Sequence, residues 1–232
     1  KGCTALSVIN PKIIIALSIE TLVFSLVPFI AAGTFFWFYG WIFLILLYIF
    51  SFVTILWVLR HNPGLIEERV AVFKPDEPIW DKAYIILLFI LVSIWWILIP
   101  LDAVRFHWSQ MPTWLHVMGA IVLSCSFYLM WLTYRENPYL ASAVRIQEER
   151  GQTVVSTGPY RYVRHPFYTS TLLFFLGSGF LLGSWIGVLL GLLLAGILAR
   201  RAVREERELR KGLKGYDAYM AQVKYRIIPH VW

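Results

Sequence analysis

Residues 35–59 read FFWFYGWIFLILLYIFSFVTILWVL and contain no charged side chain. About 20 consecutive apolar residues in a helix are enough to cross the roughly 30 Å hydrocarbon core of a bilayer. The rest of the chain has the same character, because 59% of its 232 residues are hydrophobic and only 15% are charged. Soluble domains carry about a quarter charged residues. The sequence therefore predicts an all-α, polytopic transmembrane helical protein.

Further apolar blocks lie on both sides of this stretch, at residues 13–32, 83–101 and 114–134. The last block, 167–199, is too long for one ordinary span and has Gly183-Ser184-Trp185 near its middle. We expect it to form a helical hairpin of two short spans. The pattern thus predicts about six membrane segments with both chain termini on the same side.

We divide the chain into an N-terminal part with four spans, residues 1–134, and a C-terminal part, residues 135–232. The second part contains the hairpin and two polar segments, a loop at 135–165 and a tail at 200–232. Two similar sequences, Arg60-His61-Asn62-Pro63 and Arg135-Glu136-Asn137-Pro138, follow even-numbered spans. We interpret both as helix-stop signals that use Asn-Pro.

Charge is distributed unevenly over this predicted topology. The net charge is +7, and most Lys and Arg residues fall on the side that carries both termini. The positive-inside rule then places both termini in the cytoplasm. Because the basic residues gather at the ends of apolar blocks, we expect them to meet lipid headgroups rather than nucleic acid. Cys3 and Cys125 lie too far apart in sequence to suggest a disulfide framework or a metal site.

The polar loop ends in a segment dense in turn-forming, aromatic and basic residues, at 152–168. Gly158-Pro159 is a turn signal, and Pro166 suits the first turn of the helix that enters the membrane. His165 would then lie at a helix N-terminus, which favours an anionic ligand group. The alternative is a basic, aromatic membrane anchor that binds no ligand.

A second charged cluster, Arg200–Leu209, directly follows the last apolar block. Arg201 and Glu205 are four residues apart, so their side chains can meet on one face of a helix. An isolated run of this kind is usually a solvated, salt-bridged helix. The predicted hairpin, however, returns this cluster to the membrane face of His165.

Together these features resemble the isoprenylcysteine carboxyl methyltransferase family, a group that includes phospholipid N-methyltransferases. The resemblance covers about residues 137–230. It rests on the run Gly158-Pro159-Tyr160-Arg161-Tyr162-Val163-Arg164-His165-Pro166 with Tyr168, on the following apolar hairpin, and on Glu205-Glu206, Tyr216, Tyr219, Arg226 and Pro229.

The resemblance implies an S-adenosylmethionine-dependent enzyme that releases S-adenosylhomocysteine. One of Glu205 and Glu206 would bind the amino group of the cofactor. Arg201, four residues before Glu205, would be the catalytic residue on the substrate side together with Glu205, and Arg164 is the second choice for this arginine. The other implied cofactor contacts are a strand-like stretch and four residues around the helix start, namely Gln152, Thr153, Val154, Val155, Tyr160, His165, Pro166 and Tyr168.

Several acceptors suit this reading, and all are lipophilic molecules that would arrive from the bilayer. A prenylated cysteine carboxylate is the leading one, and a phospholipid amine and a small hydrophobic thiol are alternatives. A second class is an NADPH-dependent membrane reductase, and a third is a non-catalytic membrane protein. We expect contact with membrane lipids but no metal and no obligate protein partner.

Overall fold

The structure is a computed structural model of the chain. It describes residues 11–66, 78–141 and 143–232, with side chains only from residue 21 onwards. These parts are helices joined by turns and irregular segments, and no strand occurs in the described residues. The predicted all-helical membrane fold is confirmed.

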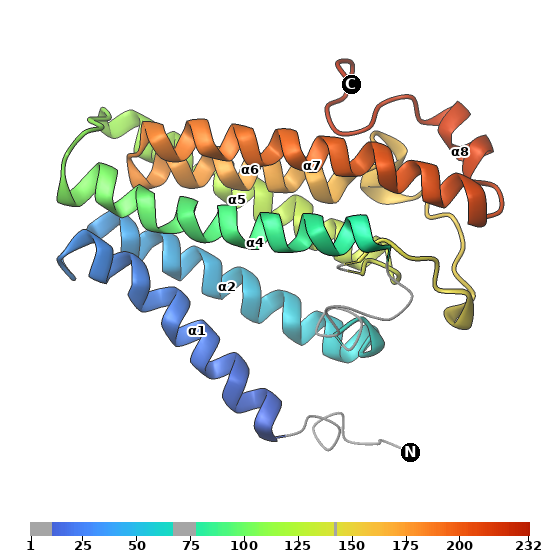
Figure 1. Ribbon diagram of the computed structural model, residues 1–232, viewed down its shortest axis with the longest axis horizontal. Helices are drawn as coiled ribbons and strands as arrows, with labels where there is room; N and C mark the ends of the chain where they lie inside the picture. Colours follow the sequence, from blue (N-terminus) through green and yellow to red (C-terminus); the bar gives the residue numbers. More distant parts are fainter. Residues whose placement is uncertain (1–10, 67–77, 142) are drawn as a thin grey trace.

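The main elements are α1 (Pro11–Ala32), α2 (Phe38–His61), α4 (Ile79–Pro100), α5 (Thr113–Glu136), α6 (Pro166–Leu182) and α7 (Trp185–Gly212). Helices α4, α6 and α7 run side by side in Figure 1, and α1 and α2 are tilted relative to them. A π-helical turn, η2 (Leu101–Arg105), continues α4, and the short helix α8 (Tyr216–Gln222) follows α7. Among the described residues, α2, α4 with η2, α5 and α7 are long and apolar enough to cross a membrane, and two shorter apolar helices accompany them.

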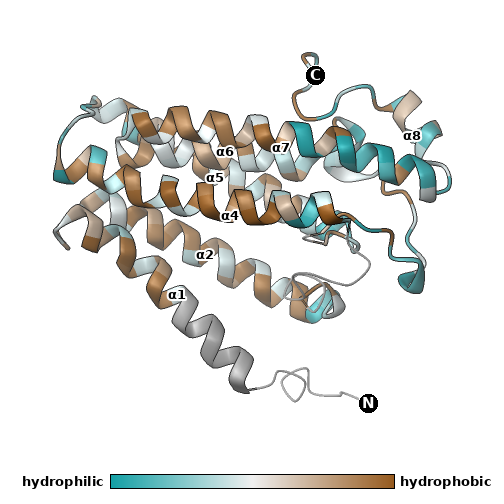
Figure 2. Cartoon of the chain, in the orientation of Figure 1, coloured by the Kyte–Doolittle hydropathy of each residue, from teal (hydrophilic) through white to brown (hydrophobic). Residues whose placement is uncertain are grey.

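The predicted C-terminal hairpin is present as α6 and α7. Gly183 ends α6 with a φ of +82°, a conformation that glycine adopts without steric cost. Ser184 then caps α7 by accepting a hydrogen bond from Gly187 N at 2.8 Å. The helix continues beyond residue 199 to Gly212, because its Arg- and Glu-rich second half also favours helix. Figure 2 shows the change from an apolar to a polar surface along α7.

Small residues let the core helices approach closely. A Cβ atom on Gly177 of α6 would come within 2.6 Å of Leu123 N in α5, so glycine is needed at this crossing. Close backbone contact through small residues is a common way to pack membrane helices. This contact fixes α6, and hence the start of α6, against α5.

The end of the bundle that carries the second half of α7 is rich in polar residues (Figure 2). The 137–165 loop, α8 and the residues after α8 lie there, beside the end of α5 and the start of α4. Asn62 and Asn137 are the C-cap residues of α2 and α5, which agrees with the helix-stop interpretation of both Asn-Pro sequences. The proposed division of the chain at residues 134 and 135 stays a prediction.

Candidate active site

The polar end of the bundle contains a cavity of about 300 Å³. Its walls come from α4, the 137–165 loop, the start of α6, the second half of α7 and the segment that includes α8. Of the residues predicted from the sequence, most line it: Gln152, Thr153, Val154, Val155, Tyr160, Arg164, His165, Tyr168, Arg201 and Glu205. Pro166 and Glu206 lie outside this lining.

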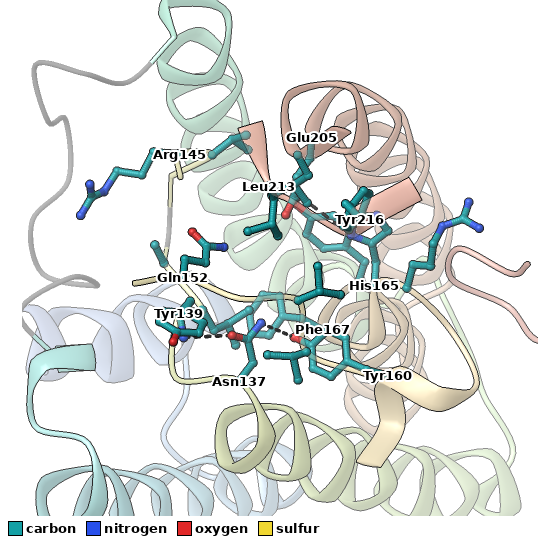
Figure 3. A pocket seen from close by; sticks show the side chains of 18 of the residues that line it. Asn137, Tyr139, Arg145, Gln152, Tyr160, His165, Phe167, Glu205, Leu213 and Tyr216 are labelled. Carbon is teal, nitrogen blue, oxygen red and sulfur yellow. Dashed lines mark hydrogen bonds and ion pairs between the residues drawn. The ribbon is translucent and has the colours of Figure 1, made fainter. Parts of the chain in front are cut away.

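The carboxylate of Glu205 is part of the cavity wall. Its Oε2 accepts a hydrogen bond from the Tyr168 hydroxyl at 2.8 Å and lies 4.0 Å from Nδ1 of His165. Its side chain retains 26% exposure. Figure 3 shows Glu205 close to Tyr216 and His165, with Gln152, Tyr139 and Asn137 lying further across the cavity. Within the described residues, Glu205 is the only carboxylate in the lining.

Arg201 meets Glu205 through Tyr168. Its Nη1 donates to the Tyr168 hydroxyl at 3.2 Å, and that hydroxyl donates onward to Glu205. The predicted proximity of Arg201 and Glu205 on one face of α7 therefore holds, with a tyrosine between them.

Asp81 in the first turn of α4 is a partner of Arg201 that sequence reasoning missed. Arg201 Nε donates to Asp81 Oδ1 at 2.7 Å and Nη2 donates to Oδ2 at 3.0 Å. Asp81 is fully buried. One signal was available in the sequence, because an acidic residue at the edge of an otherwise apolar span is costly and often functional.

Glu206, by contrast, points into a network of the protein's own cations. Its Oε1 accepts from Arg164 Nε at 2.6 Å and lies 3.3 Å from His165 Nε2, and its Oε2 accepts from Arg226 Nε at 2.9 Å. Only 4% of its side chain is exposed. The two glutamates that the sequence could not distinguish thus differ: one faces the cavity and the other holds α7 to the α6 start and the tail.

Arg164, the second choice for the substrate-side arginine, is heavily engaged. Besides Glu206, its Nη1 donates to the carbonyl oxygens of Val223 and Lys224 at 2.7 and 2.9 Å. Through these hydrogen bonds Arg164 holds the end of the 137–165 loop to the tail, and it also borders the cavity.

His165 is the N-cap residue of α6, and Pro166 begins the helix, as predicted. The expected anionic group at this helix start comes at least in part from the chain itself, because both Glu205 and Glu206 approach the imidazole ring. The ring also stacks on Tyr168, with centroids 5.5 Å apart. Pro166 contributes by fixing the helix start rather than by lining the cavity.

On the opposite wall, Tyr160, which the sequence predicted, is hydrogen-bonded to a group that includes Asn137 and Tyr139, which it did not predict. Asn137 Nδ2 donates to the Tyr160 hydroxyl at 2.7 Å, and Tyr139 N donates to Asn137 Oδ1 at 2.9 Å (Figure 3). Tyr219 donates its hydroxyl to the Tyr160 carbonyl at 2.8 Å. The sequence predicted that Asn137 ends a helix, but it did not indicate that the same residue also forms part of the cavity wall.

Burial keeps the phenols of this region protonated. Burial raises the pKa of Tyr160 above its ordinary value, and burial followed by the Glu206 and Glu205 carboxylates raises the pKa of Tyr216. Each phenol therefore remains a hydrogen-bond donor at alkaline pH as well as at neutral pH. The predicted strand-like stretch at 152–155 is irregular backbone, since no neighbouring strand pairs with it in the described residues.

One comparison with known proteins finds a family match that covers much of this site. Residues 114–214 match the model of the phospholipid methyltransferase family. The resemblance to a family of integral membrane methyltransferases is thereby confirmed. The matched range runs from α5 to the end of α7 and includes Tyr160, His165 and Glu205. A search of curated proteins finds no match to the chain.

Proposed function

We propose that this membrane protein is a methyltransferase, which transfers a methyl group from S-adenosylmethionine to a lipophilic acceptor that reaches the cavity from the bilayer. The main support is the carboxylate of Glu205, which lines the cavity and keeps part of its surface open. A carboxylate in this position suits the ammonium group of the cofactor, since charge-assisted hydrogen bonds are the strongest of their kind.

The charge balance of the lining also favours a cationic ligand. Three arginines line the cavity, and each one forms an ion pair with a carboxylate that lies outside the lining. The pairs are Arg145 with Glu149, Arg164 with Glu206, and Arg201 with Asp81. Glu205 contributes the remaining negative charge, which suits S-adenosylmethionine, whose ammonium and sulfonium groups outweigh its one carboxylate.

The size and remaining surface of the cavity fit the same ligand. A volume of about 300 Å³ lies at the lower end of the range for small-molecule sites. Val154, Val155, Leu209 and Leu213 provide apolar surface, and Tyr160 provides an aromatic ring beside a hydroxyl. These groups would hold a purine nucleoside, while Glu205 would hold the amino-acid end.

When bound, S-adenosylmethionine supplies a methyl group that its sulfonium has already activated. The residues of the chain then need only orient the acceptor and exclude water. Arg201 lines the cavity, and with its charge balanced by Asp81 it would orient an acceptor carboxylate by hydrogen bonding, which supports carboxyl O-methylation of a prenylated cysteine. A phospholipid amine is the second candidate, supported by the description of the matched family. An amine acceptor also requires a base, and His165 or Glu205 is within the lining.

Methyl transfer from labelled S-adenosylmethionine tests the proposal. Purified protein in detergent is given N-acetyl-S-farnesylcysteine, phosphatidylethanolamine or a lipophilic thiol. We expect labelled product from the farnesylated carboxylate, whereas product from the phospholipid alone would favour the second candidate. Calorimetry with S-adenosylhomocysteine and NADPH gives a reading that does not depend on the acceptor. Tight binding of NADPH without binding of S-adenosylhomocysteine contradicts methyl transfer.

A further inference from the structure

Asp81 links the N-terminal spans to the proposed active site. It belongs to α4, outside the residues that match the family model, and it is fully buried. Its carboxylate nevertheless binds Arg201 through two parallel hydrogen bonds of 2.7 and 3.0 Å. Two-point contact fixes the plane of a guanidinium group as well as its position.

The same carboxylate also holds the loop that forms the opposite side of the cavity. Asp81 Oδ2 accepts a hydrogen bond from Val144 N at 2.8 Å. Val144 and its neighbours Ala143 and Arg145 line the cavity, whereas Asp81 itself does not. One buried carboxylate thus joins α4, α7 and the 137–165 loop.

From Asp81 a continuous set of contacts leads to Glu205. Asp81 binds Arg201, Arg201 donates to the Tyr168 hydroxyl at 3.2 Å, and Tyr168 donates to Glu205 at 2.8 Å. A change at Asp81 would therefore reach Arg201 first and Glu205 only through two further groups. The guanidinium of Arg201 should respond more strongly than the carboxylate of Glu205.

We propose that Asp81 is a positioning residue, which orients Arg201 toward the methyl acceptor and sets the cavity wall at Val144. This inference rests on the proposed function. It predicts that Asp81 affects use of the acceptor more than binding of the cofactor product. A merely structural ion pair would affect thermal stability without this selectivity.

Asp102 offers a matched control. It is also fully buried and lies in η2, 21 residues after Asp81 and so about 30 Å along the helix axis. Its Oδ2 accepts hydrogen bonds from Ser109 and Ser184 at the end of the bundle away from the cavity. Asp102→Asn therefore perturbs a comparable buried carboxylate without touching the site.

The experiment compares wild type, Asp81→Asn, Asp81→Glu and Asp102→Asn in detergent. It measures Tm, S-adenosylhomocysteine affinity, and kcat and KM with N-acetyl-S-farnesylcysteine and phosphatidylethanolamine. For Asp81→Asn we expect kcat/KM for the acceptor to fall at least tenfold and S-adenosylhomocysteine affinity to stay within threefold. Asp81→Glu, which keeps the charge, should lose less. Asp102→Asn should lower Tm and leave kcat/KM within threefold.

Two results overturn the positioning role. One is kcat/KM within threefold for Asp81→Asn, and the other is an equal loss of acceptor use and cofactor affinity. If Asp81→Asn does not fold, Asp81→Glu provides the test, because its longer side chain displaces the guanidinium of Arg201. An unchanged kcat/KM in Asp81→Glu then contradicts the inference. A wild-type protein that binds neither S-adenosylmethionine nor S-adenosylhomocysteine refutes the proposed function, and the positioning role with it.

Discussion

Glu205 and Glu206 are adjacent in α7 but have different surroundings. The Glu205 side chain is 26% exposed and borders the cavity, whereas the Glu206 side chain is 4% exposed and accepts hydrogen bonds from Arg164 and Arg226. Successive residues on a helix point about 100° apart, so one turn of α7 can supply a ligand-binding group and a structural group. This difference leads to separate predictions for the two positions.

Glu205→Gln should weaken cofactor binding with little change in folding. The substitution removes the charge from a contact worth about 1.5 to 3 kcal/mol, so S-adenosylhomocysteine affinity should fall roughly ten- to a hundredfold. Calorimetry on the purified variant measures this loss, and thermal melting serves as the control. Unchanged affinity at an unchanged Tm would remove Glu205 from the site.

Glu206→Gln should show the opposite pattern. It leaves two arginines facing a neutral amide in a buried position, and breaking a buried ion pair costs about 3 to 5 kcal/mol. The amide keeps one hydrogen-bond acceptor, so we expect the lower part of this range. Denaturant unfolding and Tm in detergent report the loss. A variant as stable as wild type would show that the network around Glu206 contributes little.

His165→Ala should lower both stability and activity. The imidazole is 6% exposed, stacks on Tyr168 and lies 3.3 Å from Glu206, so its removal disturbs packing as well as the site. We expect a loss of about 2 kcal/mol in the free energy of unfolding, within the usual range for such changes. His165→Gln retains a side-chain donor for Glu206 and should recover part of the stability. Denaturant unfolding and methyl-transfer assays measure the two effects. An alanine variant with wild-type stability and wild-type activity would contradict this placement of His165.

Local sequence signals predicted the parts of the fold that depend on local physics. Gly183 and Ser184 marked the hairpin turn because a left-handed glycine and an N-capping serine act within a few residues. The apolar blocks predicted the spans because the length and hydrophobicity of a span are also local properties of the sequence. The apolar pattern ends at residue 199, and the spacing of Arg201 and Glu205 indicated a helix beyond it, but not that one continuous helix runs to Gly212.

Contacts between distant segments could not be read in the same way. Asp81 and Arg201 are 120 residues apart, and nothing in the residues around either one specifies the other. Whether Glu205 or Glu206 faces the cavity depends on where Arg226 and the tail pack, which is set by the tertiary structure. The motif at 158–168 therefore identified the site, but not the division of roles within it.

Alkaline pH should destabilise the protein through its buried phenols. Burial raises the pKa of Tyr160, Tyr216 and Tyr219 above the ordinary value of 10.0. Below pH 10 these groups are protonated in both states, and above it the unfolded chain loses the protons first. Stability should then fall with rising pH by up to about 1.4 kcal/mol per pH unit for each tyrosine.

Melting temperatures between pH 8 and pH 11 check this expectation. Tyr219→Phe should reduce the slope above pH 10, although it also removes the hydrogen bond to the Tyr160 carbonyl. Its Tm at pH 8 provides the reference for that lost bond. A Tm that is flat up to pH 11, or a slope that Tyr219→Phe leaves unchanged, would contradict the role of these phenols.

Opposite ends of the bundle should face opposite sides of the membrane. Trp185 N donates to Ser109 Oγ at 2.9 Å, which fixes the 106–112 segment beside the α6–α7 turn. Residues 148–150 lie in the loop that lines the cavity, and α5, about 36 Å long, separates the two regions. Because Lys and Arg concentrate at the cavity end, the positive-inside rule assigns that end to the cytoplasm.

Reporter fusions at Trp108 and Arg150 should therefore read outside and inside, respectively. The reverse result would separate the cavity from cytosolic S-adenosylmethionine and contradict the proposed function, whereas equal readings would contradict the span between them.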